Sequence, residues 1–174
     1  MTVAPILILD ASLLINFLKV DRIDIIRVYP AEILITEHVR DEVTTAYPAQ
    51  LARLDKAIKA GILEVMIIDD IADIEQIVAF REDRTQRQLG IGECSAIIMA
   101  LRRNLGIGID DGPAIQTIRR EFPHIHIIRT VDLIIEAIKE GFLSIVEADQ
   151  IKGEWERSHR FKLKFRSFND LIKV

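Results

Sequence analysis

The sequence predicts an α/β fold in which a central parallel sheet is covered by helices. Short continuous aliphatic runs such as Ile6–Leu9 have the pattern of strands that are buried on both faces of a sheet. Stretches with apolar residues at helical spacing separate these runs, and the connections between them are short. Alternating strands and helices of this kind indicate a doubly wound sheet, where sites form at the carboxyl ends of the strands.

The first half of the chain contains three of these aliphatic runs. We expect strands at residues 6–9, 33–35 and 63–68, and helices at 13–18, 36–47, 51–60 and 71–87. Ser12 is expected to cap the first helix, because its side chain can accept a hydrogen bond from a first-turn N–H. The second helix carries an apolar stripe of Val39, Val43 and Ala46 and ends before Pro48, and Gly61 closes the third.

The second half continues the alternation as far as Gly141. We expect helices at 94–103, 114–122 and 131–141, with strands at 107–109 and 126–128. Pro113 suits the start of one helix, and Gly141 suits the end of the last. The domain is therefore expected to span residues 1–144, followed by a basic and aromatic extension at residues 145–174.

Length and charge limit the classes of function. The 174 residues suit one compact domain with a short appendage. A net charge of −4 argues against a general polyanion binder, so nucleic-acid contact requires a local basic patch. Cys94 is the single cysteine, which excludes an internal disulfide framework and fits a reducing cytoplasm. The apolar runs are too short to span a bilayer, and residues 1–5 lack the features of a secretory signal.

The extension has two interpretations. Its aromatic residues are Trp155, Phe161, Phe165 and Phe168, and they lie among several lysines and arginines. Aromatic rings among cations can stack on bases while the cations hold phosphates. The same rings can instead pack the extension onto the domain or onto a second subunit, and this second interpretation is favoured on sequence alone.

Acidic residues stand where the predicted fold brings segments together. Asp10 ends the first strand, and Asp110 with Asp111 ends the strand at 107–109. Glu42 borders the buried stripe of its helix, and Glu93 begins an apolar helix after two glycines. Each acid also has an ordinary explanation as a turn residue, a helix cap, a first-turn acid or a solvated charge.

The joint placement of these acids favours a metal site. If Asp10 and Asp110 end neighbouring parallel strands while Glu42 and Glu93 project from adjacent helices, four carboxylates converge on one small volume. Their mutual repulsion is relieved by protonation or by a bound dication. Mg²⁺ or Mn²⁺ held by carboxylates and water can promote phosphodiester cleavage, so the expected substrate is a nucleic-acid backbone.

Four segments of the sequence together resemble the successive motifs of the PIN domain family. They are ILILDASLLIN at 6–16, VRDEV at 39–43, GIGECSAI at 90–97 with Ala100, and GIDD at 108–111. The similarity runs from about Ile6 to Ser144 and is strongest to the prokaryotic VapC-like branch, whose late helix and glycine stop resemble AIKEGFL at 137–143. Glu93 departs from many members of that branch, where aspartate is common.

This resemblance implies a PIN-like three-layer α/β/α sandwich around a central parallel sheet. It also implies a Mg²⁺- or Mn²⁺-dependent endoribonuclease, the toxin of a toxin–antitoxin pair, acting on RNA. Asp10, Glu42, Glu93 and Asp110 would be the catalytic, metal-binding acids, with Asp111 as an additional or substitute ligand. Ser12 and Asn16 would be polar neighbours that orient metal-bound water or phosphate. A small antitoxin protein and a second copy of the chain are the implied partners, the late helices or the aromatic tail being the candidate dimer interface.

Other functions receive less support from the residues. A noncatalytic PIN-fold module that binds nucleic acid or protein through the tail is the main alternative. Nucleotide binding is weakly supported, because neither glycine pair completes a dinucleotide or phosphate-loop motif. The histidines, which are His38, His124, His126 and His159, show no zinc-ligand spacing. Ser12, Ser95 and Cys94 have no nearby histidine signature, so serine or cysteine nucleophilic chemistry finds little support.

Overall fold

The computed structural model describes residues 5–46, 48–83 and 89–172. Its strands are β1 (Ile6–Leu9), β2 (Glu32–Thr36), β3 (Glu64–Met66), β4 (Gly106–Gly108) and β5 (Ile127–Ile128). Its α-helices are α1 (Ala11–Lys19), α2 (Glu37–Ala46), α3 (Pro48–Lys59), α4 (Ile71–Glu82), α5 (Ile91–Arg103), α6 (Gly112–Glu121), α7 (Thr130–Lys139) and α8 (Ile145–Ser158). Two 3₁₀ helices, η1 (Ile23–Val28) and η2 (Phe168–Asp170), complete the described elements.

The five strands form one parallel sheet in the order β3-β2-β1-β4-β5. The chain proceeds outward from β1 through β2 to β3, then returns to place β4 on the other side of β1. The strand order therefore reverses between β1 and β4, which pair with Leu9 opposite Gly108. In open α/β sheets this reversal opens a crevice at the carboxyl ends of the two strands.

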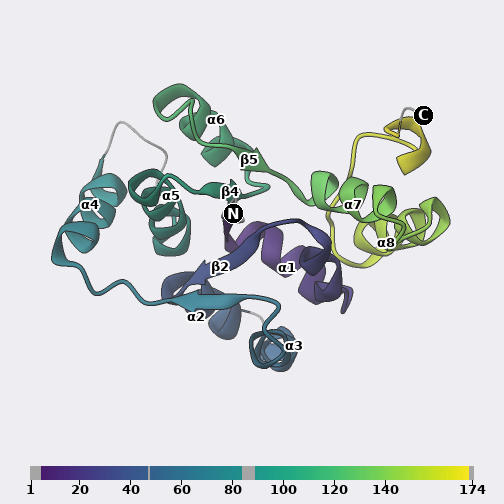
Figure 1. The fold of residues 1–174 in the computed structure, drawn as a ribbon, viewed down its shortest axis with the longest axis horizontal. Helices are drawn as coiled ribbons and strands as arrows, with labels where there is room; N and C mark the ends of the chain where they lie inside the picture. The colour runs from purple at the N-terminus through teal and green to yellow at the C-terminus, as the bar shows by residue number, and fades with distance from the viewer. Residues whose placement is uncertain (1–4, 47, 84–88, 173–174) are drawn as a thin grey trace.

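Helices cover the sheet, as the buried strand residues require. Leu7, Ile8 and Leu9 of β1 are all buried, so both faces of this strand need an apolar cover. Helix α5 contacts β1, β2 and β4, whereas α1 packs against α2 and α3. Figure 1 shows α4 and α8 at opposite ends of the long axis of the molecule, with the strands between them. The predicted α/β/α architecture is confirmed.

Most expected elements are present, with ends displaced by a few residues. Each expected strand is found, and each expected helix overlaps one of α1 to α7. Residues 84–87 of the helix expected at 71–87, and the side chain of Ala46 in the predicted stripe, lie outside the described residues. One cap prediction was wrong: Asp10 and not Ser12 caps α1, because the Asp10 carboxylate accepts a hydrogen bond from the backbone N–H of Ser12 at 2.9 Å.

The tail contains a helix that was not predicted, α8, and its aromatic rings pack inward. Trp155 and Phe168 are fully buried, and the Trp155 ring lies edge-on to Phe17 of α1 and to Phe161. Base stacking on Trp155 or Phe168 is therefore excluded, and the interpretation that the tail packs onto the domain is confirmed. The division of the chain at residue 144 stays a prediction. Among the described residues, no helix combines the length and apolar character needed to span a bilayer.

Candidate metal-binding site

Asp10 and Asp110 lie at the point where the strand order reverses. Asp10 directly follows β1, and Asp110 comes two residues after the end of β4. The backbone N–H of Asp10 donates to the carbonyl oxygen of Gly108 at 2.8 Å, which joins the two strand ends. The sequence-based expectation that these two acids end neighbouring parallel strands is therefore met by the topology.

Asp10 is a buried carboxylate with one unsatisfied oxygen. Its side chain is fully buried, and its Oδ2 accepts the hydrogen bond from Ser12 that caps α1. Its Oδ1 has no hydrogen-bond partner among the described residues. Burial raises the pKa of Asp10 from 3.8 to about 6, although hydrogen bonds from Ser12 and Ala11 act in the opposite direction, and the nearby Glu42 carboxylate adds a smaller increase. A buried carboxylate oxygen without a donor is costly, so this atom calls for a positively charged or hydrogen-bonding partner.

Glu42 and Glu93 lie next to each other around the start of α5. Oε1 of Glu42, a residue of α2, accepts a hydrogen bond from the N–H of Gly92 at 2.8 Å. Oε2 of Glu93 accepts one from the N–H of Gly90 at 3.0 Å and so caps its own helix. The pKa of Glu42 is raised by burial and, to a lesser extent, by Glu93. A Cβ atom at position 92 would come within 2.6 Å of the Glu42 carboxylate, so Gly92 leaves the space that Glu42 occupies.

Asp110 is held by a separate set of donors. Its Oδ2 accepts hydrogen bonds from Asn16 Nδ2 at 3.1 Å and from the Thr130 hydroxyl. Its Oδ1 accepts one from the N–H of Thr130 at 3.2 Å and lies 3.6 Å from Nε of Arg129. Burial raises the pKa of Asp110, although these donors and Arg129 act in the opposite direction. The backbone N–H of Asp110 donates to Ser12 Oγ at 3.1 Å, which links Asp110 to the residue that contacts Asp10.

The predicted acids therefore lie at one edge of the sheet, but they do not converge as tightly as expected. The Glu42 carboxylate raises the pKa of Asp10, and the Glu93 carboxylate raises that of Glu42. Ser12 links Asp10 to Asp110 through hydrogen bonds to both residues. Within the described residues, however, no three His, Cys, Asp or Glu side chains are close enough to hold an ion together. Glu42, Glu93 and Asp110 instead accept hydrogen bonds from protein donors.

The donor chemistry at this edge fits Mg²⁺ or Mn²⁺. Carboxylate oxygens are the ligands that such hard cations prefer, and Oδ1 of Asp10 is buried without a donor. Mg²⁺ keeps several of its water molecules when it binds to proteins, so it needs only one or two direct carboxylate contacts. Carboxylates such as Glu42 and Asp110 can then contact the ion through water.

The three remaining predicted residues have structural contacts of their own. Ser12 and Asn16 both bind Asp110, and Asn16 also donates to Thr130 Oγ1 at 3.3 Å. Asp111 caps α6, since its Oδ2 accepts a hydrogen bond from the N–H of Ala114 at 2.9 Å. The ordinary explanation of Asp111 as a helix cap is thus realised in the structure.

Sequence reasoning missed two residues that contact Asp110. Arg129 and Thr130 follow β5 directly, and Thr130 is fully buried. The position of Thr130 carried a usable signal, because polar side chains after parallel strands collect at the same edge of a sheet.

A buried pair of hydroxyl groups was also missed. The oxygens Thr36 Oγ1 and Ser95 Oγ lie 2.7 Å apart, and Ser95 Oγ donates to the Gly92 carbonyl oxygen at 2.8 Å. This pair fixes the start of α5, and with it Gly92, against the end of β2.

The structure gives no support to cysteine chemistry at this edge. The Cys94 thiol is buried, and burial together with Glu93 raises its pKa to about 11. A thiol with this pKa is almost entirely protonated near neutral pH and is a poor nucleophile.

Comparison with protein families agrees with the motifs. A family model described as PIN domain matches residues 6–153. Among solved structures, the PIN domain of T. brucei RRP44 is similar, with 14% sequence identity, 80% coverage of this chain, 82% coverage of that chain and a TM-score of 0.48. No curated protein matches the sequence. Because the family model covers most of its length, the chain belongs to the PIN domain family.

Proposed function

We propose that this protein is a metal-dependent endoribonuclease that cleaves RNA phosphodiester bonds and is the toxin of a toxin–antitoxin pair. PIN domains are generally nucleases and typically use divalent metals, so the family supports the class of reaction. The similarity of the motifs to the VapC-like branch supports the toxin role, with a small antitoxin protein as the partner that neutralises it. The observation that carries the proposal is the buried and unsatisfied Oδ1 of Asp10, next to Glu42 at the carboxyl end of β1.

The residues at this edge would have two roles: some would bind the metal ion, and others position the carboxylates that bind it. Asp10, Glu42, Glu93 and Asp110 would hold a Mg²⁺ or Mn²⁺ ion, whose chemistry is to activate water and to stabilise charge that develops on phosphate. Asn16 and Thr130 fix the orientation of the Asp110 carboxylate. Gly92 fixes Glu42 through its N–H. Arg129 brings a half-exposed guanidinium beside Asp110, where it can contact an RNA phosphate.

Cleavage of RNA tests the proposal. Labelled RNA is incubated with metal-free protein to which Mn²⁺ or Mg²⁺ is added, for the unmodified chain and for an Asp10→Asn, Glu93→Gln double variant. We expect the double variant to lose more activity than the roughly 10- to 100-fold that the loss of an indirect metal partner costs. Asp55→Asn is the matched control, because Asp55 lies on α3 and its carboxylate pairs with Arg40 of α2. Equal cleavage by the unmodified chain and the double variant would reject the assignment.

One observation favours a second candidate, a noncatalytic PIN-fold module that binds nucleic acid or protein. Three of the acids accept hydrogen bonds from the protein itself, and no three of the described acidic, histidine or cysteine side chains stand close enough for an ion. Calorimetry separates the two candidates. Binding of Mn²⁺ that is lost in Asp10→Asn supports the nuclease, whereas RNA binding without any Mn²⁺ binding supports the module.

A further inference from the structure

Residues 157–166, which we call the basic segment, form the most cationic stretch of the chain. They include Arg157, Arg160, Lys162, Lys164 and Arg166 and contain no acidic residue, although the whole chain carries a net charge of −4. A local basic patch is the feature that an acidic protein needs for contact with a polyanion.

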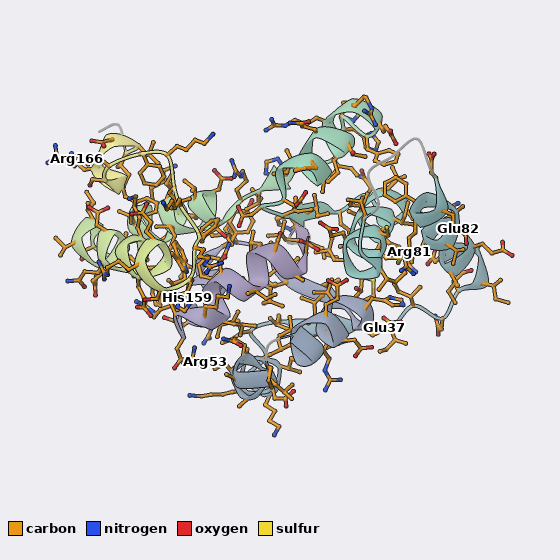
Figure 2. All side chains as sticks on the ribbon, turned by 180° about the vertical axis from the view of Figure 1, so that it is seen from behind. Glu37, Arg53, Arg81, Glu82, His159 and Arg166 are labelled. Carbon is orange, nitrogen blue, oxygen red and sulfur yellow. The ribbon has the colours of Figure 1, made fainter. Side chains whose placement is uncertain are left out.

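Apolar and cationic side chains alternate in the basic segment. Phe161, Leu163 and Phe165 are partly buried and pack against the hydrophobic core. Lys162 and Lys164, which alternate with them, are exposed. Arg166 is also exposed and lies at the outer edge of the yellow C-terminal segment in Figure 2. The packing of the apolar side chains thus turns the cations toward solvent.

Both ends of the basic segment are fastened to α8. The N–H of Phe161 donates to the Trp155 carbonyl oxygen at 3.2 Å, and the two rings lie edge to face with centroids 5.5 Å apart. Beyond the other end, Asp149 accepts hydrogen bonds from Ser167 Oγ at 2.6 Å and from the N–H of Phe168 at 2.9 Å. The cations are therefore presented on a fixed scaffold, which lowers the entropy lost when they bind a ligand.

Three cations of the basic segment form no ion pair with a described carboxylate. Within the described part of the chain, no carboxylate forms an ion pair with Arg160, Lys164 or Arg166. Glu156 is near Lys162, but one of its oxygens already accepts hydrogen bonds from Lys152 at 2.8 Å and from the N–H of Leu163 at 3.4 Å.

We propose that the basic segment binds the phosphate backbone of single-stranded RNA, as an electrostatic substrate-docking surface outside the acidic site; this rests on the proposed ribonuclease function. Because the Phe161 and Phe165 rings are partly buried against the core, the segment offers its exposed cations for phosphates in preference to its rings for bases. Binding through it is therefore independent of base sequence and weakens strongly with salt.

Fluorescence anisotropy in EDTA tests this surface without any catalysis. The probe is a labelled single-stranded RNA of about 20 nucleotides, longer than typical single-strand binding sites. The test variant is Lys162→Gln, Lys164→Gln, Arg166→Gln. The control variant is Lys56→Gln, Lys59→Gln, Arg119→Gln, which removes the same charge from exposed positions on α3 and α6.

We expect the test variant to bind RNA at least tenfold more weakly than the control variant at low salt. Loss of three phosphate contacts should also reduce the slope of log K against log salt by about 2. Equal affinities and slopes in the two variants would overturn the proposal, as would tighter binding of the unmodified chain to anionic lipid vesicles than to RNA.

The outcome is separable from that of the nuclease proposal. Mn²⁺-dependent cleavage of a dinucleotide, which offers a single phosphodiester for the acidic site and no further backbone for the basic segment, is expected to be the same in both variants. If the unmodified chain cleaves nothing but the test variant still loses RNA binding, the nuclease proposal fails and the docking surface stands.

Discussion

At the scale of single residues, Asp10 shows a conflict between stability and function. Its carboxylate is fully buried, one oxygen has no hydrogen-bond partner among the described residues, and burial raises its pKa to about 6. Ionising this group in the folded protein costs on the order of 3 kcal/mol relative to the unfolded chain. If Asp10 served only to cap α1, an Asn at this position could cap the helix without the cost of ionising a buried carboxyl group.

This conflict predicts that Asp10→Asn stabilises the protein when metal is absent. Well below pH 3.8 Asp10 is protonated in both states, and between pH 3.8 and about 6 the unfolded chain ionises first, so rising pH destabilises the fold. We therefore expect the free energy of unfolding in EDTA to be similar for variant and unmodified chain well below pH 3.8. Above pH 6 the variant should be more stable by up to about 3 kcal/mol. Urea unfolding across this pH range measures the difference.

Added Mn²⁺ provides the control for this prediction. Binding to the folded state alone should stabilise the unmodified chain by about 2.7 kcal/mol at a concentration 100 times the dissociation constant. Asp10→Asn should gain much less. This account of Asp10 would be contradicted if the free energies of unfolding of the two proteins changed in parallel with pH in EDTA. Equal stabilisation of both proteins by Mn²⁺ would also contradict it.

The sequence predicted where the acids lie but not what they contact. Asp10 and Asp110 could be placed at one edge because parallel strands end on the same side of a sheet. The direction of each carboxylate depends on donors from distant segments, such as Gly92 for Glu42 and Thr130 for Asp110. No local pattern encodes such long-range hydrogen bonds, so the sequence alone overestimated the convergence of the acids.

At the scale of secondary structure, α8 shows why one helix escaped prediction. Its buried positions are Ala148, Ile151, Lys152 and Trp155, which have the spacing of one helical face. Lys152 within this face and the neighbouring Gly153 interrupt the apolar pattern by which a helix is predicted from sequence. A usable signal was present in Ser144 and Glu147, which form a capping box: the N–H of Ser144 donates to Glu147 Oε2 at 2.8 Å, and the N–H of Glu147 donates to Ser144 Oγ at 3.2 Å.

Trp155 connects α8 to the candidate site, and this connection predicts the effect of two substitutions. Its Nε1 donates to the Asn16 carbonyl oxygen at 2.7 Å, and the Asn16 side chain in turn binds Asp110. Trp155→Ala should lower the free energy of unfolding by about 3–5 kcal/mol, because it empties a buried site. Trp155→Phe keeps most of the packing but leaves the Asn16 oxygen unpaired, which costs about 1–3 kcal/mol. Urea unfolding of each variant measures these losses.

Phe142→Ala is the matched control for an aromatic side chain near α8. Phe142 is 46% exposed, so its truncation should change the stability much less than that of Trp155. An unchanged stability of Trp155→Phe would show that the hydrogen bond to Asn16 contributes nothing to the attachment of α8.

At the scale of the whole molecule, the two most distinctive surfaces lie at opposite ends. The basic segment belongs to the end that carries α8, whereas α4 lies at the other end of the long axis (Figure 1). Ile71, Ile74 and Val78 are exposed on α4 and spaced by three and four residues, so they share one face of the helix, and the exposed Ile67 lies just before it. Contiguous exposed apolar side chains of this kind mark interaction surfaces.

We predict that the chain forms a homodimer through this face of α4. The late helices and the tail are less suited to a dimer interface, because Trp155 and Phe168 are buried within the chain. Ile71→Glu, Ile74→Glu should produce a monomer, since each copy would place carboxylates against those of the other. Light scattering after size-exclusion chromatography should give about twice 19.8 kDa for the unmodified chain and about 19.8 kDa for the variant.

Val146→Glu is the control for this variant, because Val146 is 66% exposed but lies on α8 at the other end of the molecule. It should leave the dimer intact, and dissociation by Val146→Glu, or a dimer that survives both substitutions on α4, would place the interface elsewhere. In a dimer joined through α4, each basic segment would belong to the end of its chain that lies away from α4. The Ile71→Glu, Ile74→Glu variant should therefore bind a short RNA as tightly per chain as the dimer does, so the two surfaces act independently.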